Sequence, residues 1–277
     1  MTAPLQRVLV RAPDPAALAG WREYGWRAEP DAARALREHE ALCRILAEAG
    51  AQVIVGAEDA GPNPDAIYAH DPSLVTDRGA IVLRPGKEGR RGEARVAVAD
   101  LQQAGVPVLA QLEAPATAEA GDAVWLDPAT LLVGRTYRTN DSGIAALRRL
   151  LSGVEIVELD LPHGAGPGTV VHLMSFLSLL ADDLALAYLP LLPIRVVELL
   201  RDRDIRVVEV PGEELETMGP NVLALAPRVA LALAGNDETR RRLERAGVEV
   251  LVYEGEEISR KGDGGPTCLT RPLLRSP

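Results

Sequence analysis

One arrangement of hydrophobic and polar positions recurs along the chain: an amphipathic helix ends at a glycine or aspartate and runs directly into a β-rich strand. It occurs in LAEAGAQVIVG, LQQAGVPVLA, LLSGVEIVELD, LLRDRDIRVVEV and RRLERAGVEVLVY, with joints at Gly50, Gly105, Gly153, Asp204 and Gly247. Glycine suits these joints because a helix commonly ends on a left-handed residue, a conformation that costs most side chains energy. Aspartate tolerates the same conformation. The pattern predicts five similar units.

The spacing of the joints gives each unit about the size of one supersecondary module. In the later units a strand also precedes the helix, at residues 80–84, 130–134, 184–188 and 228–233. Further segments, DAIYAH, DAVWLD, VVHLMSF and NVLALA, fall between the units, and we expect them to be strands that line a shared centre. The expected fold class is α/β, a pseudo-fivefold α/β propeller of five ββαβ-type units around a central site, with residues 1–277 as a single domain. A doubly wound sheet is the alternative, which the extra strands disfavour.

Composition and charge restrict the partners and the compartment. The net charge of −10 over 277 residues disfavours a nucleic-acid surface, because phosphate binding needs clustered Lys and Arg. The apolar stretch MSFLSLLADDLALAYLPLLPI is broken by aspartates and prolines, so we expect no membrane span. The N-terminal residues lack the pattern of a secretory signal, and two cysteines, Cys43 and Cys268, do not suggest a disulfide framework. We therefore expect a cytoplasmic protein.

Polar residues gather on the expected central segments, although a charge buried without a partner is costly. They are Asp65, His70, Asp71, Glu119, Asp122 and His172, and Cys268 follows the glycines of GDGGPTCLT, where we expect it to close the fifth unit. Each alone has an ordinary structural explanation, as a small buried thiol, a core histidine or an acid that starts a turn. Together they provide a nucleophile, a group for proton transfer, and carboxylates that attract a planar guanidinium cation. The set predicts attack on a guanidino carbon.

These motifs resemble those of the guanidine-modifying, or pentein, superfamily, and within it those of the dimethylarginine dimethylaminohydrolases. The resemblance runs from about Pro64 to Thr270 and is carried by PDAIYAHD, LRPG followed by RRGE, EAGDAVWL, GRTYRTN, HLMS and GGPTCLT. It implies that the catalytic residues are Cys268, His172 and Glu119. It implies that the substrate-binding residues are Asp65, Tyr68, His70, Asp71, Arg84 and Arg138.

The resemblance implies a hydrolase that converts dimethylarginine to citrulline and dimethylamine. Asp71 and Glu119 would hold the guanidinium while the Cys268 thiolate attacks its central carbon. His172 would protonate the departing amine, and water would then release the ureido product from a covalent thiouronium. Arg84 and Arg138 would bind an α-carboxylate, and Asp65 would lie near the α-amine. The expected partner is therefore a small guanidino compound, with no metal and no other cofactor.

Three positions bear on the choice of substrate. Met174 and Ser175 follow His172 where arginine deiminases and amidinotransferases of this fold carry a second acid, which favours the dimethylarginine type. His70 stands where an acid commonly precedes Asp71, and Ala120 replaces the first glycine of a Glu-Gly-Gly-Asp element. An arginine deiminase, or a hydrolase or amidinotransferase for another guanidino compound, is the alternative.

The same fold also occurs without catalysis. A ribosome-associated initiation factor shares this fold without a catalytic set, so a catalytically silent binding protein is the non-enzyme alternative. The retained Cys268, His172, Glu119 and Asp71 disfavour it. The segment GWREYGW at residues 20–26 either forms a lid over the site or packs its tryptophans on the body. A homodimer is left open.

Overall fold

The five helix-to-strand joints all adopt the left-handed conformation predicted from the sequence. The four glycines have φ between 70° and 96°, and Asp204 has φ 55°. In the computed structural model, which describes residues 2–169 and 172–276, each joint follows a helix and precedes a strand. The repeat read from the hydrophobic pattern is therefore a repeat of structure.

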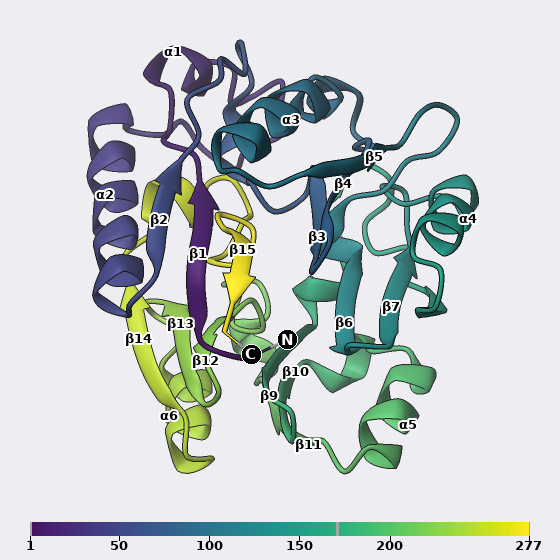
Figure 1. Cartoon of the computed structure of the whole chain (residues 1–277). Coiled ribbons are helices and arrows are strands. Elements are labelled where there is room, and N and C mark those ends of the chain that lie inside the picture. The colour runs from purple at the N-terminus through teal and green to yellow at the C-terminus, as the bar shows by residue number, and fades with distance from the viewer. Residues whose placement is uncertain (1, 170–171, 277) are drawn as a thin grey trace.

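Within the described residues, the strands form five sheets of three strands each, set around a common centre (Figure 1). In every sheet the middle strand pairs antiparallel with an inner strand and parallel with an outer strand. From inner to outer strand, four of the sheets are β3 (Ser73–Thr76), β4 (Gly79–Val82) and β5 (Val108–Gln111); β6 (Ala123–Asp127), β7 (Thr130–Arg135) and β8 (Glu155–Asp160); β9 (Leu177–Ala181), β10 (Leu184–Ala187) and β11 (Arg206–Glu209); and β12 (Leu223–Ala226), β13 (Val229–Leu233) and β14 (Glu249–Tyr253).

The remaining sheet joins the two ends of the described chain. Its order is β15 (Arg271–Arg275), β1 (Leu5–Val10) and β2 (Gln52–Val55), with β15 antiparallel to β1. The expectation that Cys268 closes the fifth unit is therefore wrong. The fifth sheet has its own inner strand, β12, and the chain after Cys268 supplies the inner strand that the first sheet otherwise lacks.

One longer helix connects the middle strand of each sheet to its outer strand, because a parallel pair requires a crossover connection. These helices are α2 (Ala32–Glu48), α3 (Glu93–Gln103), α4 (Asp141–Leu150), α5 (Ile194–Asp202) and α6 (Asp237–Arg245), and a short α1 (Pro15–Leu18) precedes them. They lie on the outside of the ring of sheets (Figure 1). In α4, for example, Ile144 and Leu147 are buried against the sheet while Arg148 is exposed, as expected for an amphipathic helix.

Two segments expected to be central strands contain short 3₁₀ turns instead. Residues Pro64–Ile67, which include the first half of DAIYAH, and Leu173–Ser175 of VVHLMSF form such turns, and the inner strands β3 and β9 begin only after them. Residues 170–171 lie outside the described residues. In the first turn, Pro64 fixes its own φ, and the Asn63 side chain accepts the Asp65 N–H (3.0 Å). The polar residues therefore precede the strands.

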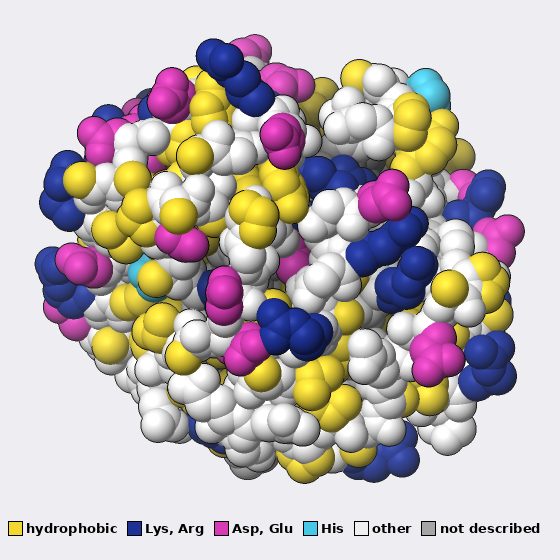
Figure 2. Space-filling view, turned by 90° about the horizontal axis from the view of Figure 1, so that it is seen from above, with side chains coloured by type: hydrophobic (Ala, Val, Ile, Leu, Met, Phe, Trp, Pro, Cys, Tyr) yellow, Lys and Arg dark blue, Asp and Glu magenta, His cyan; other side chains and the backbone are white. Residues whose placement is uncertain are grey.

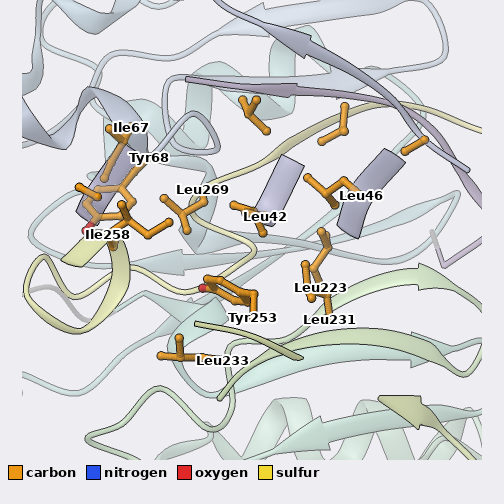
Figure 3. Packing of buried hydrophobic residues seen from close by; sticks show 14 of the residues in the cluster. Leu42, Leu46, Ile67, Tyr68, Leu223, Leu231, Leu233, Tyr253, Ile258 and Leu269 are labelled. Carbon is orange, nitrogen blue, oxygen red and sulfur yellow. Dashed lines mark hydrogen bonds between the residues drawn. The ribbon is translucent and has the colours of Figure 1, made fainter. Parts of the chain in front are cut away.

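The largest apolar cluster joins the first and last units. It packs α2 against β12, β13, β14 and the segment that follows them, and its members include Leu42, Leu46, Tyr253, Ile258 and Leu269 (Figure 3). Leu42 and Leu46 are fully buried. This cluster lies beside the segment that carries Cys268, so packing of the ring and placement of the thiol are linked.

The surface view in Figure 2 shows acidic and basic side chains interspersed around a central hollow. Within the part of the chain that the structure describes, no helix is both long and apolar enough to cross a bilayer.

Candidate active site

Every sheet contributes a polar residue from the segment that precedes its inner strand. These residues are Asp71 before β3, Glu119 before β6, His172 before β9, Asn221 before β12 and Cys268 before β15. Backbone hydrogen bonds join the segments: the His70 N–H donates to the Cys268 carbonyl (3.1 Å), and the Ala120 N–H donates to the Asp71 carbonyl (3.0 Å). Together with the side-chain contacts below, they bring a thiol, an imidazole and carboxylates to one place.

The glycines before Cys268 are required by close packing around the thiol. A Cβ at Gly264 would lie 2.1 Å from the Tyr68 ring, and a Cβ at Gly265 would lie 2.4 Å from Asn221 Oδ1. Asn221 Nδ2 lies 3.4 Å from Cys268 Sγ, and its Oδ1 accepts the N–H of the residue before the cysteine (3.1 Å). The glycine run thus allows Tyr68 to pack against this segment and Asn221 to contact the thiol.

The charge around Cys268 favours the neutral thiol while the site holds no ligand. Burial raises the pKa of the Cys268 thiol to about 12, and the nearby Asp71 carboxylate acts in the same direction. The Asn221 hydrogen bond acts against this shift. A cation that entered the site beside Asp71 would offset the carboxylate charge and favour the thiolate.

His172 is held between two carboxylates. Its Nε2 lies 3.0 Å from Glu119 Oε2, and its Nδ1 lies 4.0 Å from Asp71 Oδ1. Burial alone would lower the pKa of His172, but the charges of Asp122 and Asp71 and the contacts with Glu119 raise it to about 9. The imidazole is therefore protonated at neutral pH and can donate a proton.

Glu119 is completely buried and remains ionised. Burial alone would raise its pKa, but the His172 hydrogen bond and the charge of Arg90 lower it strongly. Its Oε1 accepts the backbone N–H groups of Gly86 (3.0 Å) and Lys87 (3.3 Å), from the loop between β4 and α3. These contacts fix the carboxylate that orients His172.

Asp122 stabilises the position of Glu119 through a hydrogen-bond chain that includes Thr139. It is fully buried, and its Oδ2 accepts the hydroxyl groups of Thr136 (2.8 Å) and Thr139 (2.7 Å). The Thr139 hydroxyl oxygen in turn accepts the Glu119 N–H (3.1 Å). Burial raises the pKa of Asp122 to about 6.

Arg90 is a buried cation of the site that was not among the residues predicted from the sequence. Its Nη1 lies 2.7 Å from Asp71 Oδ2 and 3.9 Å from Glu119 Oε2. Glu93 holds the other edge of the guanidinium with two contacts of 2.7 and 2.8 Å. The available signal was the second motif of the resemblance, RRGE, which contains Arg90 although Arg84 was chosen from it.

The two arginines predicted to bind a carboxylate occupy different surroundings. Arg138 is buried, and its Nη1 lies 3.6 Å from Glu119 Oε1 without a hydrogen-bond partner among the described residues. Arg84 is half-buried, and its Nη1 approaches the Ala116 carbonyl at 3.5 Å. Both assignments stay predictions.

Asp65 and Tyr68 lie at the side of the site that the GWREYGW segment covers. Trp26 is buried, and its Nε1 donates to Asp65 Oδ1 (2.8 Å), while its ring lies 6.2 Å from the Tyr68 ring. Tyr68 Oη donates to the Ile258 carbonyl (3.2 Å). In this structure the segment packs Trp26 on the body of the protein, as the second of the two interpretations of GWREYGW expects.

His70, which stands where an acid commonly precedes Asp71, is a neutral side chain that contacts Arg271. Its ring contacts Arg271 Nη2 at 2.9 and 3.0 Å, and its Nδ1 lies 3.0 Å from the Thr270 carbonyl. Burial and the Arg271 charge lower the pKa of His70 to about 3, so the ring is neutral. A role for His70 in binding substrate stays a prediction.

Three of these residues could in principle hold a metal ion. Ligand atoms of Asp71, Glu119 and His172 lie within 4.8 Å of one another. However, Arg90 already binds Asp71, and backbone N–H groups already bind Glu119. The contacts describe an internally neutralised cluster, and the expectation that no metal is needed stays a prediction.

Comparison with known proteins identifies the family. The sequence profile of the family N,N dimethylarginine dimethylhydrolase, eukaryotic, matches residues 22–275. The chain is 32% identical over 246 residues to N(G),N(G)-dimethylarginine dimethylaminohydrolase of Pseudomonas aeruginosa, and the match covers 87% of this chain and 89% of that protein. The chain belongs to the dimethylarginine dimethylaminohydrolase family. The family predicted from the sequence is confirmed.

Further dimethylarginine dimethylaminohydrolases extend the likeness to nearly the whole chain. The Streptomyces coelicolor protein of that name is 29% identical over 269 residues, covering 96% of each chain. A solved structure of the Pseudomonas aeruginosa enzyme, as a mutant complexed with citrulline, has a TM-score of 0.79 and 27% identity, and the match covers 99% of this chain and 100% of that chain. The pseudo-fivefold α/β fold is confirmed.

Asn221, whose Nδ2 lies 3.4 Å from Cys268 Sγ, was also missed from the sequence. Its signal was positional, because it opens NVLALA, the inner segment of the fifth unit, just as Asp71 stands before the inner strand of the second. A neutral amide is a weaker sequence signal of a catalytic site than an acid or a histidine. The repeat points to Asn221 only after the structure has shown that the site residues precede the inner strands.

Proposed function

We propose that this chain hydrolyses N-methylated arginine at the guanidino carbon, converting dimethylarginine to citrulline and dimethylamine. The observation that carries the proposal is the meeting of the segments that hold Cys268, Asp71 and His172. The His70 N–H donates to the Cys268 carbonyl (3.1 Å), and Oδ1 of the adjacent Asp71 lies 4.0 Å from His172 Nδ1. Thiol, imidazole and carboxylates are the groups required for nucleophilic attack on a cationic guanidinium.

Binding comes first in this proposal. The substrate guanidinium enters beside Asp71 and Glu119, both of which are ionised, and Arg84 and Arg138 are the candidate partners of the α-carboxylate. The added cation lowers the free energy of the thiolate relative to the thiol, and the Cys268 proton passes to solvent water. Substrate therefore activates its own nucleophile.

In the first half-reaction, the bond between Cys268 Sγ and the substrate Cζ forms, and the bond between Cζ and the dimethylated nitrogen breaks. Protonated His172 gives its proton to that nitrogen, so that dimethylamine leaves as a neutral molecule. Because Glu119 holds the imidazole through Nε2 at 3.0 Å, its orientation is fixed while the proton moves. The product of this half is a thiouronium on Cys268.

In the second half, neutral His172 removes a proton from water, which adds to Cζ. The Sγ–Cζ bond then breaks, the sulfur takes up the remaining proton of the added hydroxyl and leaves as the Cys268 thiol, and the carbonyl of citrulline is formed. Asp122 and Glu119 stabilise the imidazolium that results. No oxidant, reductant or cofactor is required for the atoms and charges to balance.

The test is production of the ureido product from dimethylarginine, monomethylarginine and arginine by the purified chain. We expect citrulline and dimethylamine from dimethylarginine, and a covalent adduct on Cys268 by mass spectrometry. Cys268→Ser should abolish both, whereas Cys43→Ser, which alters the other free cysteine on α2, should retain activity. If the wild type and Cys268→Ser are equally inactive on every guanidine, the hydrolase proposal fails. Faster turnover of arginine than of its methylated forms would instead favour an arginine deiminase.

We propose further that residues 1–277 act as one catalytic domain in the cytoplasm. All five site segments come from one chain, so a second copy is not needed to complete the site. A reducing compartment would keep the Cys268 nucleophile as a free thiol. A homodimer is compatible with this arrangement, and sedimentation analysis of the purified chain would decide it.

A further inference from the structure

Lys87 forms an ion pair with Asp65, a carboxylate that was expected to bind the α-amine of the substrate. Its Nζ lies 2.6 Å from Asp65 Oδ2 and 2.6 Å from the Tyr24 carbonyl oxygen, over the face of the Tyr24 ring. The other Asp65 oxygen accepts the Trp26 Nε1 hydrogen (2.8 Å). Both oxygens of this buried carboxylate are therefore engaged by the protein itself.

The backbone of the same lysine contacts the guanidinium end of the site. The Lys87 N–H donates to Glu119 Oε1 (3.3 Å), while its Nζ reaches Asp65. The path from the backbone nitrogen to Nζ of a lysine has as many covalent bonds as the path from the guanidino carbon to the α-nitrogen of an arginine. A substrate whose guanidinium is held at Glu119 thus extends far enough to bring an α-ammonium to Asp65. Lys87 Nζ already occupies that position.

Building on the proposed function, we propose that Lys87 is a specificity-determining residue that supplies the ammonium group at Asp65. Two cations beside one carboxylate repel each other, and this repulsion is stronger away from bulk water. The site therefore favours N-methylated guanidino carboxylates without an α-ammonium over the corresponding α-amino acids. The side chain of Lys87 is 23% exposed, so dimethylarginine can still bind by displacing Nζ toward solvent, at the expense of a higher KM.

The chain offers a matched control for this residue. Lysine occurs at only one other position, Lys261, whose Nζ also binds a buried carboxylate, Glu257, at 2.6 Å, and donates to the Glu29 carbonyl at 2.9 Å. Lys261 makes no described contact with the carboxylates around His172. A loss of charge at Lys261 therefore reproduces the loss of a lysine ion pair without altering the proposed substrate position.

The experiment compares dimethylarginine with its analogue in which hydrogen replaces the α-amino group. We expect the wild type to have a kcat/KM about tenfold higher for the analogue, the scale of one partly exposed ion pair. In Lys87→Met the freed Asp65 should bind the α-ammonium, so the preference should reverse through KM with kcat little changed. Lys261→Met should keep the wild-type preference.

Binding measurements separate this proposal from the hydrolase assignment. Dissociation constants for both compounds are measured by calorimetry on the Cys268→Ser background, with and without Lys87→Met. If Lys87→Met leaves the ratio of the two constants unchanged, the role of Lys87 is overturned, even where both compounds are hydrolysed. If the ratio reverses although no variant releases dimethylamine, the Lys87 proposal stands and the proposed reaction fails.

Discussion

At the scale of single residues, Asp71 couples the charges of the site. Its carboxylate contacts Arg90 and lies near both His172 and Cys268, and it raises the pKa of each of the latter two. The protonated imidazole of His172 can donate a proton, whereas the protonated thiol of Cys268 is a poor nucleophile. The arrangement thus keeps the acid ready and the nucleophile inactive until a cation arrives.

The pH dependence of Cys268 alkylation tests this coupling. On a Cys43→Ser background, we expect the rate of reaction with iodoacetamide to rise with pH only in the alkaline range, above the ordinary thiol pKa of 9.0 and toward about 12. The sign follows because burial and Asp71 both disfavour the thiolate. Asp71→Asn should move the inflection to lower pH. An inflection at or below the ordinary value in the parent protein would contradict the proposed charge balance.

Residue identity was predictable from the sequence where chemistry is distinctive and unpredictable where only position matters. His172, Glu119 and Asp71 could be chosen because such groups are costly to bury without a partner, and Cys268 because a thiol among them completes a nucleophilic set. Asn221 carries no charge and gave no such signal. Arg90 could not be distinguished from Arg84 because the sequence does not show which arginine the chain turns inward.

At the scale of elements, the segments before the inner strands need glycine where two of them touch. A Cβ at Gly121 would lie 2.3 Å from His172 Nδ1 and 3.1 Å from Asp71 Oδ1. Gly121 also donates its N–H to Asp71 Oδ1 (3.1 Å). Its backbone is not left-handed, so an alanine here would be opposed by these neighbouring side chains and not by backbone strain.

Gly121→Ala should therefore reduce catalysis more than stability. We expect kcat to fall by about 100-fold, because a displacement of about 1 Å in a catalytic group has an effect of that size. Steady-state kinetics and thermal unfolding measure the two effects. Gly212→Ala is the matched control, since its added Cβ meets only Tyr188 Oη at an ordinary 3.8 Å. Equal loss of activity in both variants would contradict the assigned contact.

The elements themselves were only partly predictable. The helix-to-strand joints followed from the change of hydrophobic period at a glycine or Asp204, a local signal. DAIYAH has the alternation of a strand, yet Pro64 and the Asn63 cap make part of it a 3₁₀ turn. Pairing of β15 with β1 is a contact between distant parts of the chain, which no local pattern encodes.

At the scale of the whole molecule, the ring depends on the packing between its first and last units. Leu42 on α2 is fully buried in the apolar cluster that also contains Leu223, Leu231, Tyr253 and Leu269. The same cluster borders Cys268. Loss of packing there affects both the closure of the ring and the placement of the thiol.

Leu42→Ala should lower the free energy of unfolding by about 2–5 kcal/mol, the range for a large-to-small change in a close-packed core. Denaturant unfolding measures it, with Ile194→Ala as the control because Ile194 is 78% exposed. A loss below about 1 kcal/mol for Leu42→Ala would mean that the cluster does not hold the ring together.

Because β15 closes the first sheet, the connectivity of the strands can be changed without changing the fold. In four sheets a short hairpin links the inner strand to the middle strand, whereas in the first sheet the two ends of the described chain lie side by side, and the Ser276 N–H donates to the Pro4 carbonyl (2.9 Å) (Figure 1). A circular permutant that joins these ends and opens at the exposed Asp182–Asp183 hairpin would keep every strand pairing. Cys268 would then lie in the interior of the sequence, although its neighbours in space would be the same.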